Sequence, residues 1–88
     1  MNNMKPIKVK SWVDYIAKHP DFTGCLLNED NNIYWFKNGK NHKEDGPAIE
    51  CTNGYKEWWL NGNYYSEQEY IIALRKIKLE RVLKNINE

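Results

Sequence analysis

The chain of 88 residues has little of what usually announces an enzyme, a secreted protein or a membrane protein. Its two cysteines, Cys25 and Cys51, stand alone in β-prone runs, which favours two free thiols in a reducing compartment over a disulfide. No apolar run approaches the ~20 residues of a membrane span, and no signal-peptide pattern opens the chain. We therefore expect a cytoplasmic protein that does not contact a membrane.

Motifs that carry chemistry are also missing from the sequence. It has no nucleophile elbow, no phosphate-cradling glycine loop and no cluster of cysteine and histidine. We therefore predict that the protein is not an enzyme and holds no cofactor or metal ion. The 13 basic and 12 acidic residues leave a net charge of +1, and only two of the basic residues are arginines. This balance argues against extensive binding to a phosphate backbone, although it is compatible with a local basic patch.

The strongest positive signal is a pentapeptide that occurs twice, 23 residues apart. Residues 35–39 (WFKNG) return as residues 58–62 (WWLNG). Asn-Gly between β-prone runs is typical of a hairpin turn, because both central residues of such a turn need positive φ. A third Asn-Gly lies between the copies at residues 53–54, and its counterpart one period earlier is residues 30–31. The period predicts stacked hairpins.

These signals predict an α+β fold in a single domain, residues 1–88. We expect a lead-in with a short N-terminal helix, a small twisted antiparallel β-meander of repeated hairpins, and a long C-terminal helix, at residues 1–23, 24–65 and 66–86. Within the meander we expect short strands at residues 25–28, 32–37, 40–42, 47–52, 55–60 and 63–65. Ile7 and Val9 in the lead-in suit a short edge strand.

Both predicted helices carry start signals. Ser11 suits the N-cap of the short helix, and Pro20 ends that helix. Ser66 and Glu69 form a capping box that starts the long helix. Four residues share one face of the short helix by their spacing, namely Trp12, Tyr15, Ile16 and His19.

The long helix has two apolar stripes rather than one. The first contains Tyr70, Leu74 and Ile77, and the second contains Ile72, Leu79, Val82, Leu83 and Ile86. A helix that is apolar over so wide an arc must bury two sides. Either the sheet covers one stripe and the short helix covers the other, or the second stripe meets a partner chain, such as a second copy of the protein.

The stretch from Tyr34 to Tyr70 resembles a repeat that is common in bacteriophage and large-virus proteins. That repeat has an aromatic pair, a turn and then a His-basic-Glu-Asp-Gly-Pro-Ala run, which here occupies residues 42–48 (HKEDGPA). It is also distantly similar to MORN-type hairpin repeats. The resemblance covers about forty of the 88 residues, and residues 1–23 fall outside it. It implies a β-hairpin fold and a phage or viral origin, and it implies little about activity.

One candidate for chemistry is His42, because Glu44 and Asp45 follow it closely. The Asn-Gly turn at residues 38–39 sets His42 opposite Trp35. Since Tyr65 takes the equivalent position in the next repeat, a stacking role is favoured over a general base or a metal ligand.

A second candidate is a pair of carboxylates. If residues 53–54 form a two-residue turn, Glu50 lies opposite Glu57, Ile49 opposite Trp58 and Ala48 opposite Trp59. Like charges across a strand pair are destabilising, although such a pair can act as an acid/base dyad or bind a cation. The simpler interpretation is that both side chains point to solvent and that lysines screen their charges. A catalytic role for His42, Glu50 or Glu57 is the least favoured of the functions considered.

Four aromatic residues, Tyr34, Phe36, Tyr55 and Trp59, are expected on one sheet face, near several lysines. Such a face favours a protein-interaction module, because Trp and Tyr are enriched at interface hot spots. Given the viral resemblance, the module is predicted to bind and block a host protein, such as a defence enzyme. The alternative is nucleic-acid or nucleotide binding by base stacking. The residues predicted to contact a partner are Tyr34, Phe36, Tyr55, Trp59, Arg75, Lys78 and Arg81.

Overall fold

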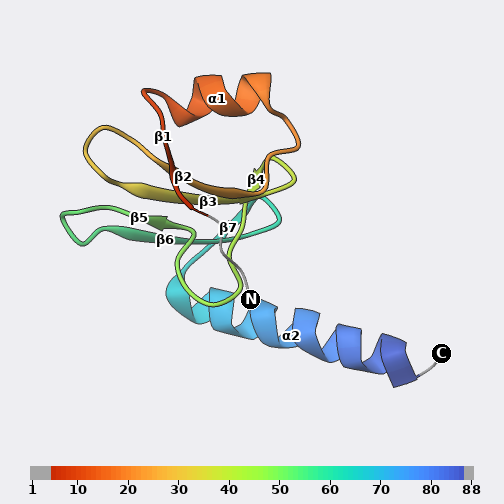
Figure 1. Ribbon diagram of the computed structural model, residues 1–88. Coiled ribbons are helices and arrows are strands. Elements are labelled where there is room, and N and C mark those ends of the chain that lie inside the picture. The colour runs from red at the N-terminus through yellow and green to blue at the C-terminus, as the bar shows by residue number, and fades with distance from the viewer. Residues whose placement is uncertain (1–4, 87–88) are drawn as a thin grey trace.

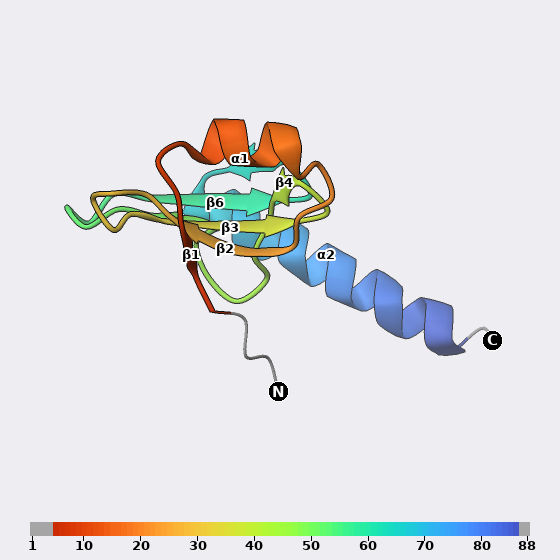
Figure 2. The ribbon, with the colours of Figure 1, turned by 45° about the horizontal axis from the view of Figure 1, so that its top comes forward.

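The computed structural model describes residues 5–86 and has the predicted α+β fold. A short helix, α1 (Trp12–Lys18), lies over one face of a seven-stranded sheet. A long helix, α2 (Glu67–Ile86), starts beneath the other face and runs out past the sheet (Figure 1). A second view keeps the two helices on opposite sides of the sheet (Figure 2). The projecting helix gives the molecule its long axis of 45 Å, against 26 and 24 Å across.

The 23-residue period corresponds to a three-stranded unit that occurs twice. The first unit is β2 (Gly24–Leu27), β3 (Ile33–Lys37) and β4 (Lys40–Asn41), and the second is β5 (Ile49–Glu50), β6 (Lys56–Leu60) and β7 (Asn63–Tyr65). Positive φ angles recur at the same places in both units: 65° at Asn31 and 95° at Gly54, 51° at Asn38 and 52° at Asn61. The predicted repeat is therefore confirmed in the backbone conformation of its turns.

The two units join along one edge of β3. All four residues of β2 pair with one edge of β3, so β4 and β5 share the other edge of β3. β5 pairs with the first half of β3 and β4 with the second half. The amide of Lys43, just after β4, donates to the carbonyl of Trp59 in β6 at 3.2 Å, which continues the sheet into the second unit.

One edge of the sheet departs from the predicted antiparallel meander. The lead-in does form an edge strand, β1 (Ile7–Lys8), but this strand pairs in parallel with β2. The parallel arrangement follows from α1, which lies between the two strands in the chain and makes a crossover connection.

The predicted register between β5 and β6 is wrong by one residue. The Cys51 amide donates to the Tyr55 carbonyl at 2.8 Å, so the turn has three residues, 52–54, with Gly54 at φ 95°. A three-residue loop with a left-handed third residue is a common hairpin connection. Consequently Ile49 lies opposite Glu57 rather than Trp58, and Ala48 does not lie opposite Trp59.

The same shift removes the predicted conflict between carboxylates. Glu50 lies opposite Lys56, not opposite Glu57, so the pair across these strands is one of unlike charge. The turns at residues 38–39 and 61–62 are two-residue turns, and Trp59 pairs with Tyr64 as predicted. The β2–β3 turn has three residues, 29–31, because the Asn28 amide donates to the Asn32 carbonyl at 3.2 Å.

The core has two halves, one on each face of the sheet. Beneath α1, Trp12 packs on Tyr34 and Phe36 with ring centroids 5.7 and 5.6 Å apart, and Phe22 packs on Phe36 at 6.2 Å. Buried residues of β2, β5, β6 and α2, and of the loop just before β5, complete the core, namely Cys25, Leu26, Ala48, Ile49, Leu60 and Tyr70. Cys25 and Cys51 are free thiols, as predicted, and burial raises the pKa of the Cys25 thiol.

Both helix starts have the predicted caps. The Ser11 hydroxyl accepts from the Asp14 amide at 3.2 Å, and helix α1 ends just before Pro20. At α2 the capping box is reciprocal: the Ser66 hydroxyl accepts from the Glu69 amide at 3.2 Å, and the Glu69 carboxylate accepts from the Ser66 amide at 3.1 Å. These caps set where α2 begins and therefore which of its residues meet the sheet.

Gly39 and Gly62 provide a matched test of how the turns pack, because both are the second residue of an Asn-Gly turn, with φ of 80° and 82°. A Cβ at Gly39 would clash with the Pro20 carbonyl oxygen, whereas a Cβ at Gly62 would lie 3.4 Å from the flexible Lys40 side chain. We expect Gly39→Ala to lower the free energy of unfolding by about 2 kcal/mol more than Gly62→Ala. Urea denaturation of both variants measures this difference, and equal losses would contradict the close approach at Gly39.

Candidate functional site

Helix α2 is held to the sheet by the first of its two predicted stripes. Tyr70 is buried, and Leu74 and Ile77 are half-buried, on the side of the helix that faces β6 and β7. The Tyr70 hydroxyl donates to the Lys43 carbonyl at 2.7 Å and accepts from the Gly46 amide at 3.2 Å. Burial raises the pKa of this hydroxyl, which keeps it protonated as a donor.

The second stripe remains exposed. We call it the outer stripe and define it as the apolar residues of α2 that face away from the sheet, namely Ile71, Ile72, Leu79, Val82, Leu83 and Ile86. Their exposed fractions range from 46% to 70%. Helix α1 lies over the opposite face of the sheet, so the interpretation in which α1 covers this stripe is wrong (Figure 2).

Three basic residues of α2 were predicted to contact a partner, and the structure separates them. Arg75 and Lys78 are exposed and make no ion pair within residues 5–86. Arg81 donates from both terminal guanidinium nitrogens to the Glu44 carboxylate, at 2.7 and 2.6 Å. Arg81 is therefore an anchor of the helix within the protein, although its side chain stays 52% exposed.

The anchor extends to His42, which is 8% exposed. One ring nitrogen, Nδ1, accepts from the Asn61 amide at 2.9 Å, so the proton lies on Nε2, which donates to Glu44 at 3.0 Å. Hydrogen bonds from Arg81, then from His42, lower the pKa of the Glu44 carboxyl to about 2. The cluster links the loop after β4, the β6–β7 turn and α2 through hydrogen bonds, of which those to the Glu44 carboxylate are charge-assisted.

This geometry explains His42 without catalysis. Its backbone amide donates to the Trp35 carbonyl at 3.1 Å, as expected for residues that face each other across the turn. Both ring nitrogens are already engaged, so neither offers a lone pair to a substrate or a metal ion. Within residues 5–86, no group of three or more His, Cys, Asp or Glu side chains is placed to hold a metal ion.

The predicted aromatic face is divided by α1. Phe36, which was expected to contact a partner, is only 3% exposed, because Trp12 of the short helix and Phe22 cover it. Tyr34 is half-buried in the same contact. Neither residue was placed under α1 from sequence, because periodicity gives the faces of a strand but not the element that covers each one.

A separate group in the second unit consists of the exposed Tyr55 and Tyr64 and the half-buried Trp59. The Glu57 carboxylate accepts from the Tyr55 hydroxyl at 2.6 Å and from the Trp59 indole nitrogen at 2.8 Å. This bond to Glu57 raises the pKa of Tyr55 to about 12. The Trp59 and Tyr64 rings pack edge to face at 5.4 Å. A carboxylate therefore lies at the centre of the group.

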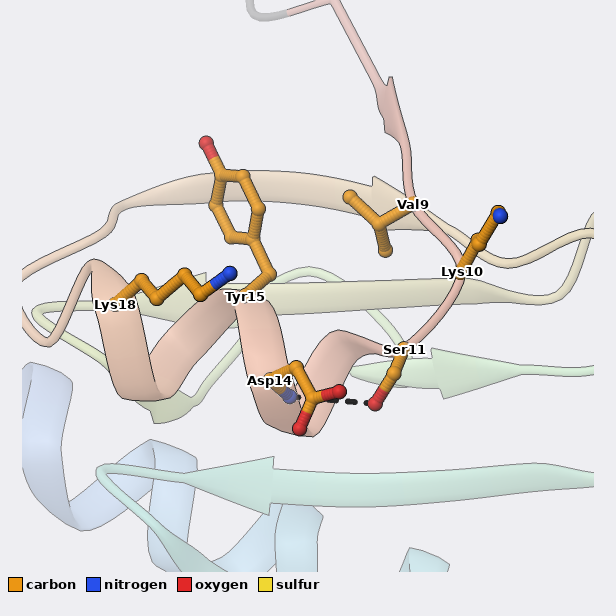
Figure 3. A pocket seen from close by; sticks show the side chains of 6 residues that line it. All are labelled: Val9, Lys10, Ser11, Asp14, Tyr15 and Lys18. Carbon is orange, nitrogen blue, oxygen red and sulfur yellow. Dashed lines mark hydrogen bonds between the residues drawn. The ribbon is translucent and has the colours of Figure 1, made fainter.

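Two hollows mark the surface, and one of them lies beside α1. The larger, about 330 Å³, is open and lies where the chain leaves β1 and enters α1, lined by Val9, Lys10, Ser11, Asp14, Tyr15 and Lys18 (Figure 3). The one hydrogen bond drawn there is the helix cap, between the Asp14 amide and the Ser11 hydroxyl. The smaller, about 240 Å³, lies beside Trp35 and Phe36. The polar side chains that line the larger hollow come from Lys10 and Ser11 before α1 and from Asp14, Tyr15 and Lys18 within it.

Comparisons of the chain with protein-family models, with curated proteins and with solved structures found no match. Across residues 5–86, neither helix combines the length and the apolar character that crossing a membrane requires. The candidate site is therefore chosen by geometry, and it is the outer stripe of α2, because its six apolar side chains are exposed.

Sequence reasoning missed Glu44 as an anchor, although a signal for it existed. Arg81 follows Tyr70, Leu74 and Ile77 at the spacing of one helix face, so it belongs to the stripe that meets the sheet. A basic residue on a packed stripe needs an acidic partner, because an unpaired charge there would be costly. The loop that carries residues 44 and 45 supplies that partner.

The Glu44 carboxylate predicts an acid-dependent loss of stability. Its folded pKa of about 2 lies below the ordinary 4.5, so its contribution is complete above pH 4.5 and is lost as the pH falls toward 2. We expect the free energy of unfolding of Glu44→Gln to fall less steeply over this range than that of the natural protein. Denaturation with urea at a series of pH values measures the slopes. Glu29→Gln, in an exposed loop, is the control, and equal slopes for Glu44→Gln and the natural protein would contradict the cluster.

Arg81 and Arg75 give a matched pair on the same helix. Arg81→Gln removes two charge-assisted hydrogen bonds at a half-exposed site, so we expect it to lower the free energy of unfolding. Arg75→Gln, at a position outside the stripe that meets the sheet, is expected to change the free energy of unfolding by less than Arg81→Gln. Thermal and urea denaturation compare the two, and an equal effect of both changes would show that the anchor is not formed.

Proposed function

We propose that this protein is a non-catalytic protein-interaction module whose binding surface is the outer stripe of α2. The observation that supports this function is the exposure of six apolar side chains on one side of one helix, pointing away from the sheet. Single exposed apolar residues are normal on protein surfaces, but a contiguous apolar surface is typical of an interaction site.

The second half of α2 strengthens the proposal. From Lys78 to the end of the described helix every residue is exposed, and the ion pair of Arg81 with Glu44 is its tie to the rest of the molecule. A short helical segment is marginal in water, because most helix stability in proteins comes from tertiary packing. Covering Leu79, Val82 and Leu83 with a partner would supply that packing and remove apolar surface from water.

The proposed partner is a host protein. This part of the proposal rests on the resemblance of residues 34–70 to phage and large-virus repeats, which suggests that the module binds and blocks a host factor in the host cytoplasm. The proposal assigns no reaction to the module, since His42 is engaged at both ring nitrogens and Glu50 and Glu57 do not face each other.

The alternative, nucleic-acid binding through the aromatic face, has weaker support. Among the rings of this face, Tyr55 and Tyr64 are exposed and Trp59 is half-buried, and the Glu57 carboxylate lies among them. A negative charge at that position opposes the approach of a phosphate backbone.

The test compares two valines with similar exposure, because a lysine in place of either one costs little in folding. Val82 lies in the outer stripe and is 54% exposed, and Val13 on α1 is 58% exposed. We expect a stoichiometric bacterial protein to be retained from a lysate by the tagged natural protein and by Val13→Lys, and to be lost by Val82→Lys. Mass spectrometry identifies the retained protein, and calorimetry with that protein purified gives the affinity.

Two other results would contradict the proposal. Retention of the same protein by Val82→Lys would place the binding surface elsewhere. A high ratio of absorbance at 260 nm to that at 280 nm, lowered by salt, would favour the nucleic-acid alternative. Light scattering on the free protein shows whether a second copy already covers the stripe.

A further inference from the structure

The outer stripe has the spacing of a seam for another helix. Ile72, Leu79, Val82 and Ile86 lie on one line, and Arg75 occupies the remaining position, so consecutive members are separated by 3, 4, 3 and 4 residues. This is the heptad pattern by which helices pack side by side at a shallow angle. The seam is about 21 Å long, which suits a partner helix of about four turns.

The charges around this seam have one sign. Arg75 lies within the seam, and Lys76 and Lys78 lie on its two flanks. All three are exposed, and none forms an ion pair within residues 5–86. The acidic residues of α2 lie off the seam: Glu80 is beyond Lys76 on the side toward the sheet, and Glu67 and Glu69 are in the first turn, where Glu69 caps the helix.

This charge pattern disfavours a second copy of the chain as the occupant. In a parallel pair in register, Arg75 would meet Arg75 of the other copy. In an antiparallel pair with Ile72 opposite Val82, Lys76 would lie beside Lys76 of the other copy, and Lys78 beside Lys78. Sliding the antiparallel pair by one heptad relieves this repulsion but leaves Ile71 and Ile72 uncovered. Like charges in such pairs are destabilising.

We propose that the outer stripe binds an amphipathic helix of another protein in which acidic residues flank the apolar seam. Acidic side chains on such a helix would pair with Lys76 and Lys78, and one would reach Arg75 at the centre of the interface. This inference rests on the proposed function, and it adds the shape and the charge of the partner. The apolar seam supplies affinity, and the basic flanks select the partner.

The experiment uses three synthetic peptides of about three heptads with the same Leu and Ile seam. Their flanking positions carry Glu, Gln or Lys, and binding to the full chain is measured by fluorescence anisotropy at low and high salt. We expect the Glu peptide to bind at least about tenfold more tightly than the Lys peptide, with the Gln peptide between them, and added salt to narrow the differences. The triple change Arg75→Glu, Lys76→Glu and Lys78→Glu should reverse the order.

Two variants separate the seam from the flanks. Val82→Lys should weaken binding of all three peptides, whereas Val13→Lys should weaken none. Equal binding of the Glu and Lys peptides, an unchanged order in the triple variant, or no binding of any peptide would overturn the inference. So would binding to phosphatidylglycerol vesicles in place of the Glu peptide, or a dimer in light scattering that the triple variant leaves intact.

The outcome for the proposed function is read separately. If a lysate protein still depends on Val82 while the Glu peptide fails to bind, the module and its surface stand and the acidic-helix inference falls. If Val82→Lys leaves the lysate protein and the peptides bound, the proposed function and the acidic-helix inference are both contradicted.

Discussion

The position of α2 depends on two contacts with the loop that joins β4 to β5. The Tyr70 hydroxyl bridges the Lys43 carbonyl and the Gly46 amide, and three turns later Arg81 holds Glu44 with both of its terminal nitrogens. Two contacts on the same side of a helix, about 16 Å apart along its axis, fix its rotation as well as its direction. Because Tyr70 and Arg81 turn one side of α2 toward the loop and the sheet, the outer stripe on its other side faces solvent.

That loop is in turn a product of the repeat. The first unit ends in β4 and the second begins in β5, and both strands share one edge of β3, so the chain between them must leave the sheet and return to it. The segment that makes this excursion carries the acceptors for Tyr70 and Arg81. The β6–β7 turn contributes as well, since the Asn61 amide orients His42, which donates to Glu44. A repeat of short hairpins thus provides a rigid base for a helix that projects from it.

Much of the fold could be predicted from the sequence because local signals and tertiary structure agree. The Asn-Gly turns at residues 38–39 and 61–62, the capping box at Ser66 and the stripe led by Tyr70 all have the expected conformations. The β5–β6 register could not be predicted in this way, since Asn-Gly occurs in both two-residue and three-residue hairpin loops, and the choice here places Thr52 inside the loop. The burial of Phe36 and the role of Arg81 also depend on which elements pack together, which periodicity along one segment does not specify.

The central claim is that the outer stripe is open to solvent in the free protein, and the most direct measurement is paramagnetic relaxation of methyl groups by a soluble nitroxide. The structure predicts strong relaxation at Ile72, Leu79, Val82 and Ile86, and little at Leu26 and Leu60, which are 0% and 1% exposed. Protection of the outer-stripe methyl groups to the level of Leu26 would mean that another part of the chain or a second copy covers them, and it would contradict the claim.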